Sequence, residues 1–383
     1  MAIGRRDFAL GAAAALAGLR ASVSNSQAAT KAAAAEAASE DQRAVLAQDA
    51  AQFMEKNNVP GLSVAIAKEG EIVYREAFGF ANRWTKEPAT PDHRFRIASV
   101  SKPVTAVAVF RLFEAGLLSP DARAFGPEGA LGPLGAEIGR DSPLAAITVD
   151  HLLTHTSGAW PNDAGDPMFA NRDYDHARLI RATLSGTYAP APPGTAYKYS
   201  NFGYCLLGRI VEHAAKRPYA DFARETVLAP VGAGGMAIGG NTEAERAPNE
   251  VRYHPVGSED PYGYDVRRMD SHGGWIATAA EVALFVAGAA GRTRPPLLSG
   301  ASMAKMSEAT AANPKYARCW SVNAAGNWWH TGSLPGTQAI AVRTQSGLGW
   351  AGFVNTRNRG SALAGDLDRL ILKMARRVPA WKA

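Results

Sequence analysis

The sequence is poor in cysteine and has no long run of like charges. Its 383 residues include two cysteines, Cys205 and Cys319, too few for a disulfide framework. We expect both to be buried free thiols, although a pair could form in an oxidising compartment. The net charge of +6 is mild and dispersed, so the composition argues against nucleic acid as a partner.

Several familiar hydrolase and cofactor motifs are also missing. There is no G-x-S-x-G, which counts against the common α/β-hydrolase architecture. His151 and His155 have the i, i+4 spacing of zinc peptidases, but Leu152 stands where those enzymes need a glutamate. The glycine-rich VGAGGMAIGG lacks the lysine of a phosphate-binding loop. We therefore expect neither a metal nor a cofactor, and we assign the two histidines to a turn.

The first residues have the pattern of an export signal. Arg5 and Arg6 precede a short alanine-rich apolar stretch and a small-residue region ending near Ala29, which is typical of twin-arginine signals. An ordinary secretory signal is the alternative. The stretch is too short for a comfortable membrane span, so we expect no stable span once residues 1–29 are removed. The sequence predicts a periplasmic or secreted bacterial protein handled by the twin-arginine export machinery.

The rest of the chain has the pattern of one catalytic domain. Residues 30–40 are expected to form a spacer and residues 41–383 the domain. Strand patterns occur at both ends of the domain, whereas the middle has helical periodicity. This arrangement predicts an α+β fold, with one antiparallel sheet built from both ends, flanked by helices, and a helical lobe over roughly 103–268 inserted into it. We expect the functional site in a cleft between the lobes.

One local pattern suggests nucleophilic chemistry. In FRIASVSKPVTA, Ser99 and Lys102 are three residues apart and share a helix face, whereas Ser101 points elsewhere. Pro103 is tolerated only in a first helical turn, which puts Ser99 at a helix N-terminus beside an amine. By itself the pattern is weak, because SMAK, starting at Ser302, repeats it. A capping serine and a solvated lysine would also explain it.

Two further motifs follow Ser99 in a fixed order. They are YSN at Tyr199–Asn201 and HTGS at His330–Ser333, and the second SxxK copy falls out of this order. With HLLTHTSG and GSLPGT, the set resembles the class C β-lactamase-like, penicillin-binding serine hydrolase superfamily over nearly all of the mature chain. The resemblance implies a β-lactamase/penicillin-binding-protein transpeptidase-like fold and an enzyme that forms an acyl-Ser99 intermediate without a cofactor.

The resemblance also implies a role for each catalytic group. Lys102, its pKa lowered in a cleft, helps to take the Ser99 proton. Tyr199 acts as a phenolate that accepts a proton and returns it to the leaving group. Asn201 either binds the amide of the substrate or orients Lys102. The backbone amides of Ser99 and Ser333 form the oxyanion hole.

Substrate-binding residues are expected along the HTG strand and after the last strand. His330 stands where most β-lactamases have lysine, and we expect it to be mostly neutral but to gain a proton below a pH of about 6.5. No E-x-x-L-N segment is present, so Tyr199 must serve both half-reactions. The expected substrate-binding residues are Asn201, His330, Thr331, Gly332, Ser333, Asn355, Asn358 and Arg359. Trp160, His272 and the loop around Tyr262 are expected mainly to pack.

These observations favour esterase-like hydrolysis of a small-molecule or short-peptide acyl substrate. Neutral esters need no cationic partner, and an alkoxide leaves more easily than an amine. A β-lactamase, a D-alanyl-D-alanine carboxypeptidase or a D-aminopeptidase remains an alternative, because acyl specificity depends on variable loops. A non-catalytic module that binds peptidoglycan or β-lactams is the alternative from another class. That module should have lost a catalytic group, and the chain has all of them.

Overall fold

The computed structural model describes residues 38–186, 191–358, 362–378 and 381. The predicted export signal, most of the predicted spacer and Arg359 lie outside these described residues. Among the described residues, none of the helices has the length and the apolar run needed to cross a bilayer.

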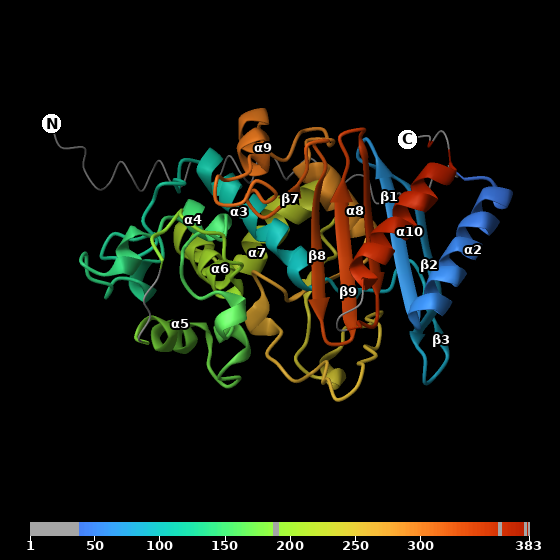
Figure 1. Ribbon diagram of the computed structural model, residues 1–383, viewed down its shortest axis with the longest axis horizontal. Coiled ribbons are helices and arrows are strands. Elements are labelled where there is room, and N and C mark those ends of the chain that lie inside the picture. Colours follow the sequence, from blue (N-terminus) through green and yellow to red (C-terminus); the bar gives the residue numbers. More distant parts are fainter. Residues whose placement is uncertain (1–37, 187–190, 359–361, 379–380, 382–383) are drawn as a thin grey trace.

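A seven-stranded antiparallel sheet joins the two ends of the domain. Its strand order is β3-β2-β1-β10-β9-β8-β7, and Figure 1 shows the N-terminal strands beside the C-terminal ones. The central pairing is β1 with β10, in which Ala65 lies opposite Ala351. The strands are β1 Gly61–Lys68, β2 Glu71–Asn82, β3 Glu87–Pro88, β7 Ser321–Val322, β8 Trp328–Leu334, β9 Thr337–Arg343 and β10 Leu348–Val354.

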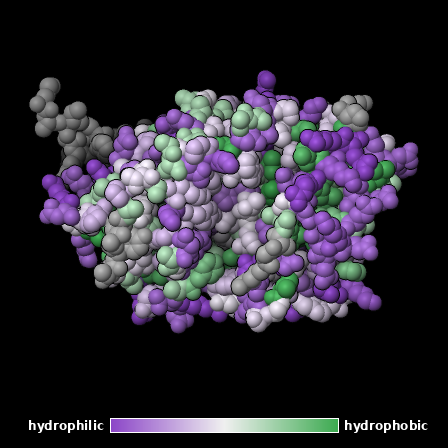
Figure 2. Space-filling view, viewed as in Figure 1, coloured by the Kyte–Doolittle hydropathy of each residue, from purple (hydrophilic) through white to green (hydrophobic). Residues whose placement is uncertain are grey.

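Helices cover both faces of this sheet. On one face lie α2 (Glu40–Asn57) and α10 (Leu363–Arg377), and on the other lies α8 (Ala279–Ala289). A capping box at Ser39 begins α2, and α10 buries one apolar stripe while its other side stays charged. Figure 2 accordingly shows hydrophilic side chains gathered over α10 and α2. By contrast α8 is apolar almost all round, because it is buried between the sheet and the helical part.

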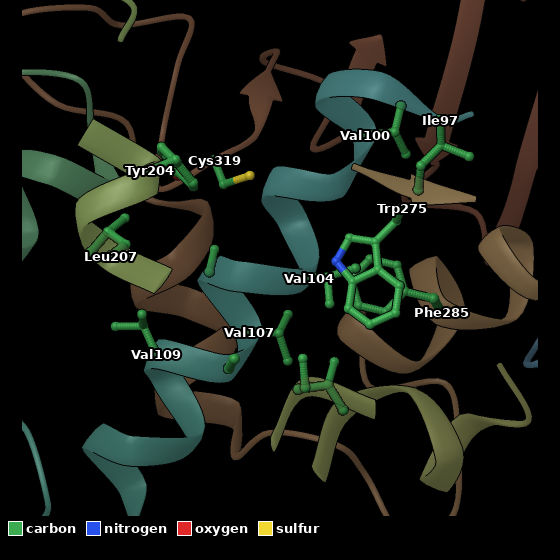
Figure 3. Close-up of a cluster of buried hydrophobic side chains, with 14 of the residues drawn as sticks. Ile97, Val100, Val104, Val107, Val109, Tyr204, Leu207, Trp275, Phe285 and Cys319 are labelled. Atoms are coloured by element: carbon green, nitrogen blue, oxygen red, sulfur yellow. The ribbon is translucent and has the colours of Figure 1, made fainter. Parts of the chain in front are cut away.

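The helical part packs around α3 (Lys102–Glu114), which is buried on nearly every side. Figure 3 shows Val104 of this helix beside Trp275 and Phe285, and Val109 on the opposite side, toward Leu207 of α6. The other α-helices are α4 Val149–Leu153, α5 His176–Leu184, α6 Asn201–Ala215, α7 Tyr219–Ala223 and α9 Gly300–Ser307. A three-stranded sheet contains β4 Phe95–Arg96, β6 Trp275–Ala277 and β5 Ala237–Ile238. The short helices are η1 Ala98–Ser101, η2 Gly132–Leu134, η3 Pro143–Ala146, η4 Asn162–Ala164, η5 Pro167–Phe169, η6 Arg224–Leu228, η7 Ala229–Val231, η8 Glu243–Glu245 and η9 Arg267–Met269.

The predicted fold class is confirmed, with one antiparallel sheet built from both ends of the domain and helices on its faces. Cys205 and Cys319 are both free and buried, as expected.

Candidate active site

Ser99 lies where a strand turns into the central helix. The chain leaves β4 and makes the 3₁₀ turn η1, and α3 starts directly after it with Pro103 in its first turn. Ala98 has a φ of 48°, a conformation that costs a non-glycine residue free energy and is common at functional sites. The consequence is that Ser99 is partly exposed, while its neighbours Ala98 and Val100 are buried.

Lys102 is completely buried and points back at Ser99. Its Nζ donates to Ser99 Oγ at 3.0 Å, to Asn201 Oδ1 at 2.7 Å and to the His272 carbonyl at 2.9 Å. Burial lowers the pKa of Lys102 from 10.5 to about 7, although Cys319 and Asp166 act in the opposite direction. Near neutral pH the side chain is therefore present both as an ammonium, which donates all three bonds, and as a neutral amine, which can accept the proton of Ser99.

Tyr199 completes a group of three around the serine hydroxyl. Its ring centroid is 4.8 Å from Lys102 Nζ, and its side chain forms a hydrogen bond with Ser99. Burial raises the pKa of Tyr199 well above 10, and the Ser99 bond offsets this only in part. The resting phenol is therefore protonated. This corrects the interpretation of Tyr199 as a phenolate base, because the charged form is poorly solvated here.

His155 holds the YSN segment in place. Its Nδ1 accepts a hydrogen bond from Ser200 N at 3.2 Å, and its carbonyl accepts one from Lys198 N at 2.8 Å. Its ring centroid lies 4.3 Å from that of Tyr199. The two hydrogen bonds thus fix Lys198 and Ser200, the residues before and after Tyr199, and the ring contact fixes Tyr199 itself. His151 instead closes a capping box with Thr148 at the start of α4. Of the two histidines assigned to a turn, His151 therefore has the predicted local role, whereas His155 binds a segment that is distant in the sequence.

The HTG strand passes against the nucleophile turn with no room for a side chain. A Cβ added at Gly332 would lie 2.2 Å from the Ile97 carbonyl oxygen and 3.0 Å from Ser99 N. Only glycine lets the two backbones approach this closely. The next residue, Ser333, is exposed beside that approach. The arrangement puts the backbone of Ser333 beside that of Ser99, as an oxyanion hole made of their two amides requires.

Thr331 and His330 face opposite sides of β8. Thr331 is exposed, whereas His330 is buried. The His330 Nδ1–H donates to the Thr331 carbonyl at 2.6 Å, and Nε2 lies 3.4 Å from the Tyr316 hydroxyl. Burial, with a further contribution from Lys102, lowers the pKa of His330 to about 3. His330 therefore stays neutral when the pH falls somewhat below 6.5. The expectation that it gains a proton at that pH is wrong.

Of the residues expected after the last strand, Asn355 and Asn358 are described by the structure and Arg359 is not. Asn355 is fully buried, and its Nδ2 donates to the carbonyls of Phe80, Ala81 and Arg252 at 3.0, 3.2 and 3.1 Å. This amide binds the neighbouring strand and loop rather than a substrate, which corrects its assignment. Asn358 is exposed.

Arg357, which lies between Asn355 and Asn358 in the chain, is paired with an acidic side chain. Arg357 makes a bidentate ion pair with Glu259, with N···O distances of 2.9 and 2.7 Å. Bidentate pairing uses the same guanidinium edge that would bind a substrate carboxylate.

The second SxxK copy has an ordinary structural role. Ser302 lies in the first turn of α9, where its amide donates to the Ser299 cap at 3.2 Å. Lys305 is exposed and pairs with Glu308 at 2.7 Å. Burial therefore does not act on Lys305 as it does on Lys102. This copy cannot supply the base that Lys102 supplies.

Two contacts of the site were not predicted from the sequence. Asp166 Oδ2 accepts a hydrogen bond from Asn201 Nδ2 at 2.6 Å, and the His272 carbonyl accepts from Lys102. The Asp-Pro pair at 166–167 does signal a helix cap, and Asp166 caps η5. Neither contact could be found from spacing, because each joins segments that are distant in sequence.

The site contains a serine, a buried amine with a lowered pKa, and a phenol, and the fold is that of β-lactamases and penicillin-binding proteins. Together they define a class of serine hydrolases. A family model described as Beta-lactamase matches residues 46–373. The chain belongs to this family and is a serine hydrolase of the β-lactamase-like superfamily.

Curated relatives include esterases and penicillin-binding proteins. Esterase EstB of Burkholderia gladioli is 31% identical over 325 residues, which is 78% of this chain and 73% of EstB. Penicillin-binding protein 4* of Bacillus subtilis (strain 168) is 30% identical over 223 residues, which is 55% of this chain and 44% of that protein.

Solved structures share the fold. D-amino acid amidase from Ochrobactrum anthropi SV3 aligns with a TM-score of 0.72 at 21% identity, covering 89% of this chain and 100% of that one. The octameric penicillin-binding protein homologue from Pyrococcus abyssi gives 0.68 at 24%, covering 86% and 77%. At these identities the likeness concerns the fold alone.

Proposed function

We propose that this serine hydrolase cleaves esters whose acyl group carries no charge, through an acyl-Ser99 intermediate. The observation that carries the proposal is the fully buried Lys102, 3.0 Å from Ser99 Oγ, with a pKa lowered to about 7. A serine hydroxyl needs such a base to become a nucleophile. Similarity to a protein named as an esterase over 78% of the chain supports the ester as substrate.

Acylation starts with attack on the ester carbonyl. Ser99 Oγ bonds to the carbonyl carbon while its proton passes to the neutral amine of Lys102. The resulting oxyanion accepts hydrogen bonds from the amides of Ser99 and Ser333. As the tetrahedral intermediate collapses, the C–O bond to the alcohol breaks. Tyr199 gives its phenolic proton to the leaving alkoxide and regains one from the Lys102 ammonium.

Deacylation repeats the same steps with water as the nucleophile. A water molecule gives a proton to the neutral amine of Lys102 and attacks the acyl carbon. The same two amides bind the oxyanion. Collapse breaks the bond to Ser99 Oγ, which takes the phenolic proton of Tyr199 as the acid leaves, and Tyr199 regains one from the Lys102 ammonium. Lys102 and Tyr199 thus serve both half-reactions.

Neutral substrates fit the electrostatics better than anionic ones. His330 has a pKa lowered to about 3, Asn355 is bound to three carbonyls, and Arg357 is paired with Glu259. None of these three offers a free cation to a substrate carboxylate. β-Lactams and D-alanyl peptides carry such a carboxylate, so they are expected to be poorer substrates.

A substrate panel tests the proposal. Purified protein is given p-nitrophenyl butyrate, a chromogenic cephalosporin, a D-alanyl-D-alanine peptide and a D-amino-acid amide, with the Ser99→Ala variant as control. We expect kcat/KM to be highest for the ester and to vanish in the variant. A higher value for the cephalosporin would make β-lactamase the better name, and binding without turnover of any substrate would support the non-catalytic alternative.

We propose in addition that the protein is exported by the twin-arginine route. Support comes from Arg5 and Arg6 before a weakly apolar stretch. Replacing both with lysine should leave the precursor uncleaved in the cytoplasm, as cell fractionation would show. Normal processing of that variant would contradict the route.

A further inference from the structure

Phe169 and Tyr264 form an aromatic pair that the fold leaves partly exposed. Their ring centroids are 5.6 Å apart and the rings are nearly perpendicular, with an interplanar angle of 85°. Phe169 lies in η5 and is 46% exposed, and it follows Asp166, which binds Asn201, by three residues. Tyr264 is half-buried. The pair therefore offers aromatic surface to a ligand, from a loop that contacts the active site.

Tyr264 connects this pair to the nucleophile turn. It packs against a cluster of buried side chains that contains Ala98 and Leu334. Ala98 directly precedes Ser99, and Leu334 directly follows Ser333. The cluster under Tyr264 thus includes a neighbour of each residue whose amide is assigned to the oxyanion hole.

The buried face of β8 sets the order of the groups along the site. His330 lies on this face beside Tyr199, with ring centroids 6.4 Å apart. Gly332 comes next, against the nucleophile turn, and Leu334 follows on the same face, in the cluster under Tyr264. In the proposed mechanism Tyr199 gives its proton to the leaving alkoxide, so the alcohol side of the ester lies toward His330. The acyl side then extends the other way, toward Leu334 and the aromatic pair.

Arg268 fixes the loop that carries Phe169. This arginine is buried and follows Tyr264 by four residues. Its guanidinium donates to four carbonyls of the loop at 2.5–3.1 Å, which are those of Met168, Ala170, Asn171 and Tyr174. The segments that carry the two rings are thus held together by more than the ring contact. A surface that is already in place costs a ligand little ordering free energy.

We propose that Phe169 and Tyr264 form the acyl-binding surface of the enzyme and select esters whose acyl group ends in an aromatic ring. This inference rests on the proposed acyl-Ser99 ester hydrolysis and names its substrate class. Gly332 and Leu334 are two strand residues apart, a separation of about 7 Å. An acyl group therefore needs several carbons between its carbonyl and its ring to reach the pair, and an acetyl group is too short.

Two isomeric esters place the same ring on opposite sides of the carbonyl. They are ethyl 4-phenylbutyrate and 4-phenylbutyl acetate, and their competition in one mixture gives the ratio of their kcat/KM values. We expect the wild type to favour the phenylbutyrate by about tenfold, the value of one aromatic contact with its buried area. Phe169→Ala and Tyr264→Ala each remove one ring of the pair and should lower the ratio about fivefold.

Two control variants separate the aromatic surface from general effects of substitution. Phe80→Ala is the matched control, because Phe80 is also exposed but lies on β2, which β1, β10 and β9 separate from β8; it should leave the ratio unchanged. Tyr264→Phe keeps the ring and removes a hydroxyl that has no hydrogen-bond partner among the described residues, so its ratio should stay near that of the wild type. Thermal melting checks that each variant is folded.

The outcomes distinguish the two proposals. An unchanged ratio in folded Phe169→Ala, or an equal fall in Phe80→Ala, would overturn the role of the pair while ester hydrolysis stands. A ratio that rises in Phe169→Ala would put the surface on the alcohol side and would equally overturn it as an acyl site.

A binding measurement judges the pair if neither isomer is hydrolysed. The probe is 3-phenylpropylboronic acid, which carries the same aryl chain and whose boron bonds to a serine oxygen such as Ser99 Oγ. A Kd about fivefold weaker in Phe169→Ala than in the wild type, measured by calorimetry, would support the acyl-binding surface, and an equal Kd would overturn it. Ester hydrolysis itself fails only if p-nitrophenyl butyrate is not hydrolysed either.

Discussion

The lowered pKa of Lys102 predicts the pH dependence of the reaction. With a pKa of about 7, about half of the lysine side chains are neutral at pH 7, compared with about 3 in 10⁴ at the ordinary value. Burial thus raises the concentration of the base about 10³-fold. Since the neutral form is the active one, kcat/KM should rise about tenfold per pH unit below pH 6 and level off above about pH 8.

The assay is the hydrolysis of p-nitrophenyl butyrate measured from about pH 5 to about pH 9. Lys102→Arg keeps a cation that cannot deprotonate, so it should lower kcat/KM about 10³-fold and abolish the inflection. Burial shifts the pKa values of the other titratable groups around Lys102: those of the thiol and the phenols rise and those of the imidazoles fall, all away from 7, whereas that of the Asp166 carboxyl rises from its ordinary value toward 7. They are Cys319, Tyr199, Tyr204, Asp166, His155, His272 and His330.

His330→Gln is the matched control for this profile. His330 has a pKa lowered to about 3, so its removal should leave the inflection near pH 7 in place. An inflection that disappears in His330→Gln, or a flat profile in the wild type, would refute the assignment of the base to Lys102.

Four further substitutions test the site. Ser99→Ala should lower kcat/KM by about 10⁴-fold or more and prevent labelling by a fluorophosphonate. Ser302→Ala should leave both kcat/KM and labelling near wild type. Labelling lost only in Ser302→Ala would reverse the assignment of the nucleophile. Gly332→Ala puts a methyl group against the Ile97 carbonyl and should separate the two oxyanion amides, so kcat should fall about 10²-fold with a smaller change in KM; unchanged kcat would contradict the close approach. Asn355→Ala removes the side-chain donor from three carbonyls, of which that of Ala81 keeps a bond from Arg252 N, and should cost about 2–4 kcal/mol in urea unfolding with kcat/KM nearly unchanged. The opposite result would restore Asn355 as a substrate-binding residue.

Local features of the site could be predicted because they depend on neighbours in the chain. A spacing of three puts Ser99 and Lys102 on one face of a helix, and Pro103 can stand only at its start. The α+β arrangement followed from strand patterns at both ends of the domain. The order of the three motifs then separated Ser99 from Ser302, which spacing alone could not do.

The chemistry of each residue depended on burial, which tertiary packing alone decides. The same SxxK spacing gives an enclosed amine at Lys102 and an exposed ion pair at Lys305, because only the first is surrounded by α6 and the segment before β6. Strand alternation separates His330 from Thr331, but only the packing against Tyr316 turns the histidine inward. Asp166 meets Asn201 across 35 residues. Desolvation and long-range hydrogen bonds set these properties, and neither is a function of local sequence.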